Sequence, residues 1–352
     1  MYMTPYLSDK LRNLSALAIL MVLYIHMYYT EGAMMPTLLI IEQFVGSGIC
    51  SVAVPLFYVI SGFLFFLNVP YGLRSISKKI KKRLRTLLIP YLLANILTFI
   101  FYVSLNLIAL KIAAIDRVVN FKVLDVILED GFMATLKLVF INPPIAFQLW
   151  FIRDLLVVIV FSPCIWLLLN SISSRIWKIL FPIALLLIFV LGGHNGYCGA
   201  FVWFTIGGFI AVSKIQVNRK SVSIVPIMLF WFCYVGLSVL WSQNAECMYL
   251  CRYIPLIGIP ALWYGYDLVT NCTKNKSENI RKIVDYTFFI YLIHEPLLNI
   301  FKKLPLLLIR SEAMLIGCYI LIPLFFYLFA LMLGSIIKRT FPKAYSIYTG
   351  GR

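Results

Sequence analysis

Long runs of apolar residues constrain the fold of this chain more than any other feature. About 20 such residues cross the ~30 Å hydrocarbon core of a bilayer as a helix. The runs do not alternate apolar and polar residues, as the strands of a membrane barrel would, so helices that satisfy their own backbone groups are expected. The ten runs cover about 12–30, 44–68, 87–110, 148–170, 176–192, 198–213, 221–241, 247–270, 283–301 and 312–337.

Composition supports the same conclusion. The chain has 352 residues, of which 62% are hydrophobic and 13% are charged. Soluble domains have about 25% charged residues, and disordered chains are poor in apolar ones, so both classes are excluded. No internal repeat or linker interrupts the pattern. The predicted fold is all-α: a polytopic membrane helix bundle with about ten transmembrane helices, forming one domain over 1–352.

The excess of basic residues predicts the orientation of the helices. Lys and Arg number 31 against 14 Asp and Glu, a net charge of +17. With the N-terminus inside, 22 of the 31 lie in inner segments, eight in outer segments, and Arg153 within a span. Cytoplasmic loops are enriched in basic residues. We therefore expect a multi-pass protein of the cell membrane with both termini in the cytoplasm, in contact with membrane lipids and not with nucleic acid.

Two segments outside the spans are distinctive. The longest outer loop, 111–147, has apolar residues at helical spacing from Phe121 to Leu138, which predicts an interfacial helix or a lid. The densest basic run extends from Arg74 to Arg85 on the inner side. It is typical of a phosphate-binding site, but the topology signal and contact with anionic lipids explain it equally.

Ionisable residues inside predicted spans are costly and therefore candidates for function. They lie at one rough depth on three helices. A histidine there is suited to general-base catalysis near neutral pH, or it is a structural group bonded to a carbonyl. Arg153 either binds a carboxylate or phosphate, or extends to the interface with Asp154 as its partner. Pro296 is expected to break the helix of His294 and free carbonyl groups. The five residues are His26, Arg153, Asp154, His294 and Glu295.

At these residues the chain resembles the integral-membrane acyltransferases of family 3, which include bacterial polysaccharide O-acetyltransferases. Five motifs occur in order over about 10–335. They are a first helix ending in a histidine, a Phe-x-x-Ser-Gly-Phe segment, a basic segment before Pro-Tyr, a Leu-Trp-Phe segment and a late Tyr-Leu-x-His helix. In this chain they are Leu17–His26, Val54–Leu64, Lys82–Tyr91, Gln148–Leu156 and Tyr286–Glu295.

The resemblance departs from the family at one position. Many relatives have an arginine eleven residues before the first-helix histidine, where this chain has Ser15. Arg12 lies about one helical turn earlier and could reach the same level.

The resemblance implies a membrane O-acyltransferase that uses a cytoplasmic acyl-CoA, expected to be acetyl-CoA, as co-substrate and no metal. The acceptor would be a hydroxyl of a surface glycan or a lipid-linked sugar. The implied catalytic residues are His26, His294 and Arg153, and the implied donor-binding residues are Arg12, Lys82, Arg83, Arg85 and Ser61.

The role of His26 has two forms. It would act as general base on the acceptor hydroxyl, or it would carry the acyl group as an acyl-histidine intermediate. The alternative function is a membrane transporter or exporter of a glycan or small solute, in which the same buried groups relay protons or bind substrate. The inverted repeats common in transporters are not visible in the sequence. The identity of the acceptor and the oligomeric state do not follow from the sequence.

Overall fold

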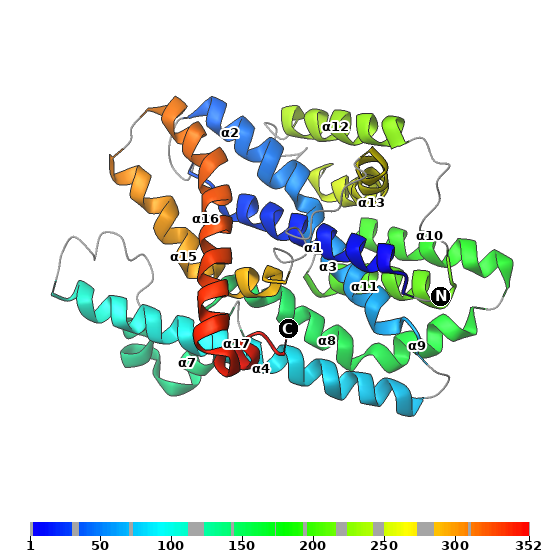
Figure 1. The fold of residues 1–352 in the computed structure, drawn as a ribbon, viewed down its shortest axis with the longest axis horizontal. Coiled ribbons are helices and arrows are strands. Elements are labelled where there is room, and N and C mark those ends of the chain that lie inside the picture. Colours follow the sequence, from blue (N-terminus) through cyan, green and yellow to red (C-terminus); the bar gives the residue numbers. More distant parts are fainter. Residues whose placement is uncertain are drawn as a thin grey trace.

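The described part of the chain is helical, and it contains no strand. The computed structural model describes residues 3–29, 35–69, 73–111, 123–141, 144–172, 174–192, 196–215, 224–241, 250–272, 285–308 and 311–351. Figure 1 shows the bundle these helices form, with α1 (Pro5–His26) near its centre. The helix α1 packs against α3, α13, α15 and α16, so residues along it are within reach of several helices.

The remaining helices follow in chain order. They are α2 (Pro36–Glu42), α3 (Ala53–Phe66), α4 (Leu73–Ala109), α6 (Val123–Asp125), α7 (Gly131–Phe140), α8 (Trp150–Val160), α9 (Ser162–Ser171), α10 (Arg175–Gly192), α11 (Gly196–Val212), α12 (Ile224–Trp241), α13 (Ile254–Cys272), α15 (Thr287–Leu308), α16 (Glu312–Thr340) and α17 (Pro342–Tyr348). Short π-helical segments are η1 (Gln43–Gly48) and η3 (Val126–Asp130), and short 3-10 segments are η2 (Ile49–Val52) and η4 (Phe147–Leu149).

Each of the ten predicted runs contains a helix, which confirms the all-helical fold, but the number of ten membrane spans stays a prediction. Among the described residues, four helices are long and apolar enough to cross a membrane, or five if a bent pair is one span. The four are Pro36–Phe66, Arg74–Ala109, Arg175–Gly192 and Glu312–Thr340. Shorter apolar helices are Gly196–Val212 and Ile224–Leu240.

The bent pair corresponds to the run predicted over 148–170. Phe147–Val160 and Ser162–Ser171 meet at an angle of 58°. Pro163 lies in the first turn of α9. Proline has no N–H to donate to the preceding turn, and it favours the start of a new helix. A single straight helix over 148–170 is therefore not what forms.

Two helices begin earlier than their apolar runs. α1 starts at Pro5, where Thr4 caps the helix by accepting from the Leu7 amide at 3.1 Å. α4 starts at Leu73, so the basic run is helical. Lys79 of this run donates to the carbonyls of Phe65 and Leu67 at 2.8 and 2.7 Å. A cation at the C-terminal end of α3 satisfies its last carbonyls and complements its dipole.

The start of α1 also carries an ion pair that the hydropathy pattern does not indicate. Lys10 is fully buried, and its Nζ lies 2.8 Å from both carboxylate oxygens of Asp267 on α13. Tyr6 donates to the same carboxylate, and the ring of Trp263 lies 4.2 Å from the ammonium. The polar first turns of α1 are therefore paired inside the bundle.

Helices α3 and α11 approach closely because glycines meet at their contact. A Cβ added at Gly62 would lie 1.9 Å from the carbonyl oxygen of Phe204. A Cβ added at Gly207 would lie 2.0 Å from the carbonyl oxygen of Val59. Small residues allow the backbones of membrane helices to touch. Helix packing thus explains Gly62 of the Ser-Gly motif, and the close contact at Gly62 fixes the position of the adjacent Ser61.

Gly207→Ala is expected to lower the free energy of unfolding by about 1–3 kcal/mol, because the added methyl group must push two backbones apart. Gly236→Ala is the matched control, since no described atom beyond its own helix backbone lies within 4 Å of a Cβ added there. The measurement is the melting temperature of each purified variant in detergent. A Gly207→Ala protein that melts with the control would show that the two helices do not depend on this close approach.

The helix expected over Phe121–Leu138 forms in pieces, as α6, η3 and α7, and Phe121 lies outside the described residues. Val123, Val139 and Ile145 form a small core with residues of α4. Leu128, Phe132 and Met133 are 80%, 74% and 68% exposed. Exposed apolar side chains on a helix outside the predicted spans fit the interfacial interpretation, and the lid alternative stays untested.

Candidate active site

The two histidines predicted inside spans lie side by side. His26 ends α1, and His294 lies in α15, which packs along α1. Their ring centroids are 5.2 Å apart. His294 is fully buried, and the side chain of His26 is 16% exposed. The convergence predicted for these two residues is therefore present in the fold.

A break in α15 forms next to His294. Glu295 leaves the helical conformation, with φ −104° and ψ 131°, at the predicted position before Pro296. Because Pro296 has no N–H, the carbonyl of Leu292 lacks its helical donor. The side-chain amide of Gln148 supplies one, at 3.3 Å to Leu292 and 2.9 Å to the Glu295 carbonyl. The sequence does not single out Gln148, because the break at Glu295 that it supports lies 147 residues away on another helix.

The hydrogen bond of His294 determines which of its ring nitrogens is free. Its Nδ1 lies 2.7 Å from the carbonyl oxygen of Tyr291, which can only accept. Nδ1 therefore carries the proton, and Nε2 of the neutral ring has a lone pair. Nε2 has no hydrogen-bond partner among the described residues. A neutral His294 can therefore accept a hydrogen bond from a hydroxyl, but it cannot donate one to an oxyanion.

A small polar cavity, the outer cavity, lies beside the histidine pair on the predicted outer side. Its volume is about 180 Å³. His26 and Glu295 line it, with His26 Nδ1 3.9 Å from Glu295 Oε1. Residues of α4 and of the segment before α8 complete its wall, so the end of the loop predicted to be outer borders this cavity. These further lining residues are Tyr28, Thr98, Tyr102, Ile145, Ala146, Phe147, Pro296, Asn299 and Lys302.

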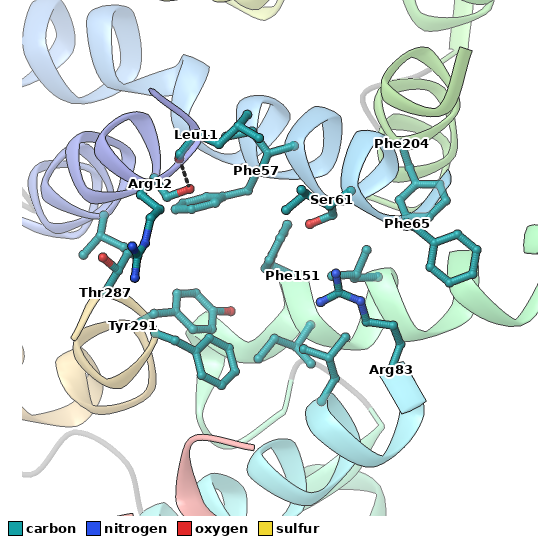
Figure 2. A pocket seen from close by; sticks show the side chains of 18 of the residues that line it. Leu11, Arg12, Phe57, Ser61, Phe65, Arg83, Phe151, Phe204, Thr287 and Tyr291 are labelled. Carbon is teal, nitrogen blue, oxygen red and sulfur yellow. Dashed lines mark hydrogen bonds between the residues drawn. The ribbon is translucent and has the colours of Figure 1, made fainter. Parts of the chain in front are cut away.

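A larger cavity of about 580 Å³ lies at the opposite, predicted inner end of the same helices. Figure 2 shows Arg12 and Arg83 on opposite sides of it, with Ser61 and Phe151 between them. Its depth is walled by aromatic and aliphatic side chains, which suits an apolar ligand chain. These include Ile19, Phe57, Ile60, Leu64, Phe65, Leu87, Phe151, Ile152, Leu155, Ile159, Phe204, Phe288 and Tyr291.

The charged residues that line this inner cavity are mostly basic. Arg12, Arg83 and Lys338 line it together with one carboxylate, Asp285. Arg12 forms an ion pair with Asp285 at 2.5 Å, in which both side chains are more than 40% exposed. No ion pair of Arg83 is found in the described ranges of the chain. The cavity therefore has excess positive charge, of which Arg83 is the less neutralised arginine.

The inner cavity shows which residue can stand in for the arginine that relatives have at the position of Ser15. Ser15 and Arg12 both line the inner cavity, one turn apart on α1. Ser15 donates to the carbonyl of Leu11 at 2.8 Å, so its hydroxyl is engaged within its own helix. Arg12 thus brings a guanidinium to the cavity that Ser15 lines, as its position in the sequence predicted.

Four of the predicted site residues line neither cavity. One is His294, which is fully buried beside His26, and the other three lie farther away. Lys82 and Arg85 are exposed, and they are not among the lining residues. Arg153 pairs with the fully buried Asp154 at 2.9 Å, donates to the Ile141 carbonyl at 2.9 Å and lies 5.1 Å from the Tyr197 ring. These contacts fit the interpretation of Asp154 as the partner of Arg153.

A row of three rings connects the two cavities. Tyr291 lines the inner one, and its ring centroid is 5.7 Å from that of His294. His294 in turn lies beside His26, which lines the outer cavity. Tyr291 is held by donating to the backbone carbonyl of Gln148 at 2.5 Å. The same residue that supports the break in α15 thus also positions the ring between the cavities.

An all-helical membrane protein with a histidine pair between two cavities is the class that the fold and the site define. Residues 10–336 match the sequence model of the acyltransferase domain of family 3, and the chain belongs to this acyltransferase family. The resemblance seen in the motifs is thereby confirmed. The search of curated proteins returned no match, and neither did the search of solved structures.

Proposed function

We propose that this protein is a membrane O-acyltransferase that moves an acyl group, expected to be acetyl, from cytoplasmic acyl-CoA to a hydroxyl of a surface glycan or lipid-linked sugar. The observation that carries the proposal is the pair of cavities on either side of His26 and His294. The inner one has mostly basic charged residues and an apolar depth. The outer one is small and polar. The protein would lie in the cell membrane with the basic cavity open to the cytoplasm.

The inner cavity fits an acyl-CoA by chemistry and size. Arg12, Arg83 and Lys338 would bind the phosphate groups, for which arginine is geometrically suited. The apolar wall would hold the pantetheine arm, and Ser61 would offer a hydroxyl to the thioester end. A volume of about 580 Å³ lies within the range of roughly 300–1,000 Å³ that small-molecule and cofactor sites occupy. Lys82 and Arg85 would contribute at longer range.

The chemistry requires a base on the outer side. His26 would take the proton of the acceptor hydroxyl while its oxygen attacks the thioester carbonyl. The tetrahedral intermediate then expels the CoA thiolate. The thiolate receives from the His26 imidazolium the proton that the acceptor hydroxyl gave up. His294 Nε2, with its lone pair, would orient the acceptor hydroxyl. Arg153 would contribute as a cation on the same side through its pair with Asp154.

A vesicle experiment separates this function from transport. Inverted membrane vesicles from the producing cells, which carry the native acceptor, receive radiolabelled acetyl-CoA with and without the protein. The proposal predicts protein-dependent label in a glycan or lipid-linked sugar fraction, released by mild base as expected for an ester. Movement of glycan across the membrane with no transferred label would instead support a transporter.

Arg83→Gln is expected to raise the KM for acetyl-CoA about tenfold with little change in kcat, because a charge-assisted contact to phosphate contributes about 1.5–3 kcal/mol to binding. Arg339→Gln is the matched control, since Arg339 is exposed near the end of α16 and does not line the cavity. Initial rates over a range of acetyl-CoA concentrations give both constants. An unchanged KM for Arg83→Gln would exclude the inner cavity as the phosphate site.

A further inference from the structure

We propose that Glu295 is a positioning residue for His26, forming with it a carboxylate-imidazole pair on the outer side of the membrane. This inference rests on the proposed acyl transfer and deepens it. Glu295 Oε1 lies 3.9 Å from His26 Nδ1, and both side chains line the outer cavity. Their side chains are 11% and 16% exposed, so the pair is largely removed from water.

The break in α15 gives Glu295 its position. Its backbone is non-helical before Pro296, and its carbonyl is held by Gln148 at 2.9 Å. The other carboxylate oxygen, Oε2, accepts from the side-chain amide of Asn299 at 2.5 Å, one turn later on α15. With Oε2 fixed in this way, Oε1 is directed toward the imidazole. The structure therefore holds Glu295 at two points, its backbone carbonyl and one carboxylate oxygen.

The chemistry of the pair follows from general principles. A carboxylate beside Nδ1 favours the tautomer in which Nδ1 carries the proton, and Nε2 is then free to take the proton of the acceptor hydroxyl. The imidazolium that forms is stabilised by the same carboxylate, most strongly where water is excluded. Glu295 itself exchanges no proton in this scheme: the proton passes from the acceptor to His26 and then to the CoA thiolate. The separation of 3.9 Å is longer than a hydrogen bond, so it must shorten by about 1 Å when substrate binds for the pair to form.

Two other carboxylates in this half of the protein have backbone amides as partners. Glu42 accepts from the Tyr29 amide at 2.7 Å, and Glu312 accepts from the Leu38 amide at 2.8 Å. These contacts tie chain segments together. Glu295 differs because one of its oxygens is directed at a ring that lines a cavity. We therefore assign Glu295 to the active site, and we assign a structural role to Glu42 and Glu312.

Glu295→Gln keeps the shape of the side chain and an oxygen for Asn299, but it removes the charge. We expect kcat to fall roughly tenfold or more while the KM for acetyl-CoA stays unchanged, because only the proton-transfer step is affected. Glu295→Asp, which keeps the carboxylate, should recover part of the lost kcat. Glu312→Gln is the matched control and should behave as wild type. Rates are normalised to monodisperse protein, so that misfolding does not count as lost catalysis.

The outcomes separate this inference from the function it rests on. A wild-type protein that transfers no label overturns both. Wild-type kcat in Glu295→Gln, in the same assay in which His26→Ala is inactive, overturns the assignment of Glu295 alone. Equal losses in the Asp and Gln variants also overturn it, because they would indicate a packing role in place of a charge. A rise in KM for acetyl-CoA with unchanged kcat would place Glu295 with the donor and contradict the pairing.

Discussion

His26→Ala is expected to lower the rate of acyl transfer by about 10²–10⁴-fold, the usual contribution of a general base. The effect should fall on kcat, because His26 lines the outer cavity and the donor would bind in the inner one. The assay is transfer of radiolabel from acetyl-CoA in inverted vesicles. The alternative route through an acyl-histidine predicts the same loss, so this variant tests the residue and not the choice between the two routes.

The control for this variant is the third histidine of the chain. His194 lies outside the described residues, and its Gly-rich surroundings in the sequence predict an exposed turn. His194→Ala should therefore transfer label as wild type does. Both variants must reach the membrane at wild-type levels, measured by immunoblot. Intact transfer by His26→Ala at a normal level would remove His26 from the mechanism.

Lys10→Met is expected to lower the free energy of unfolding by about 3 kcal/mol or more, because it leaves the carboxylate of Asp267 without its buried cation. Lys10 is fully buried, whereas Asp267 is 21% exposed, so the effect should lie near the lower end of the range of about 3–5 kcal/mol for broken buried pairs. Thermal unfolding in detergent measures it.

The double variant Lys10→Met, Asp267→Asn is the informative control. It removes both charges, and the asparagine oxygen can still accept from Tyr6. We expect it to be more stable than Lys10→Met alone, which gives a favourable coupling energy in a double-mutant cycle. Additive losses, with the double variant less stable than either single one, would mean that the two charges do not stabilise each other.

The sequence predicts the helices well because apolar runs report burial in lipid or in the bundle. It predicts their ends less well. α1 begins at the Thr4 cap, before its apolar run, and its polar first turns are buried because Lys10 pairs with Asp267 on α13, far away in sequence. α4 begins at Leu73, also before its apolar run, and Lys79 in its second turn caps α3. Hydropathy treats such residues as solvated, and only tertiary contacts make them part of a buried helix.

The candidate site is predicted in its parts but not in its arrangement. Depth along each span places His26 and His294 at one level, and Pro296 predicts the break beside them. The separate inner and outer cavities depend on how α1, α4 and α15 pack, which no single run encodes. Gln148 was missed for this reason, since its role is to satisfy carbonyls that a break on another helix exposes.

The basic residues show the same limit. A charge count predicts which side of the membrane they occupy, but not which of them faces a ligand. Arg83 lines the inner cavity, whereas Arg85, two residues later on α4, is exposed. Helical periodicity separates residues two apart by about 200°, so neighbouring cations necessarily face different surroundings. The residues from Arg74 to Arg85 therefore have different roles. Lys79 caps α3, Arg85 is exposed, and Arg83 lines the inner cavity.

The most direct test of the central claim is the content of base-labile acyl groups on the surface polysaccharide of the producing cells. It is measured in cells with the wild-type protein, without the protein, and with His26→Ala at a wild-type membrane level. The account predicts ester-linked acyl groups in the first case and their loss in the other two. An acyl content that does not change when the protein is absent would contradict it.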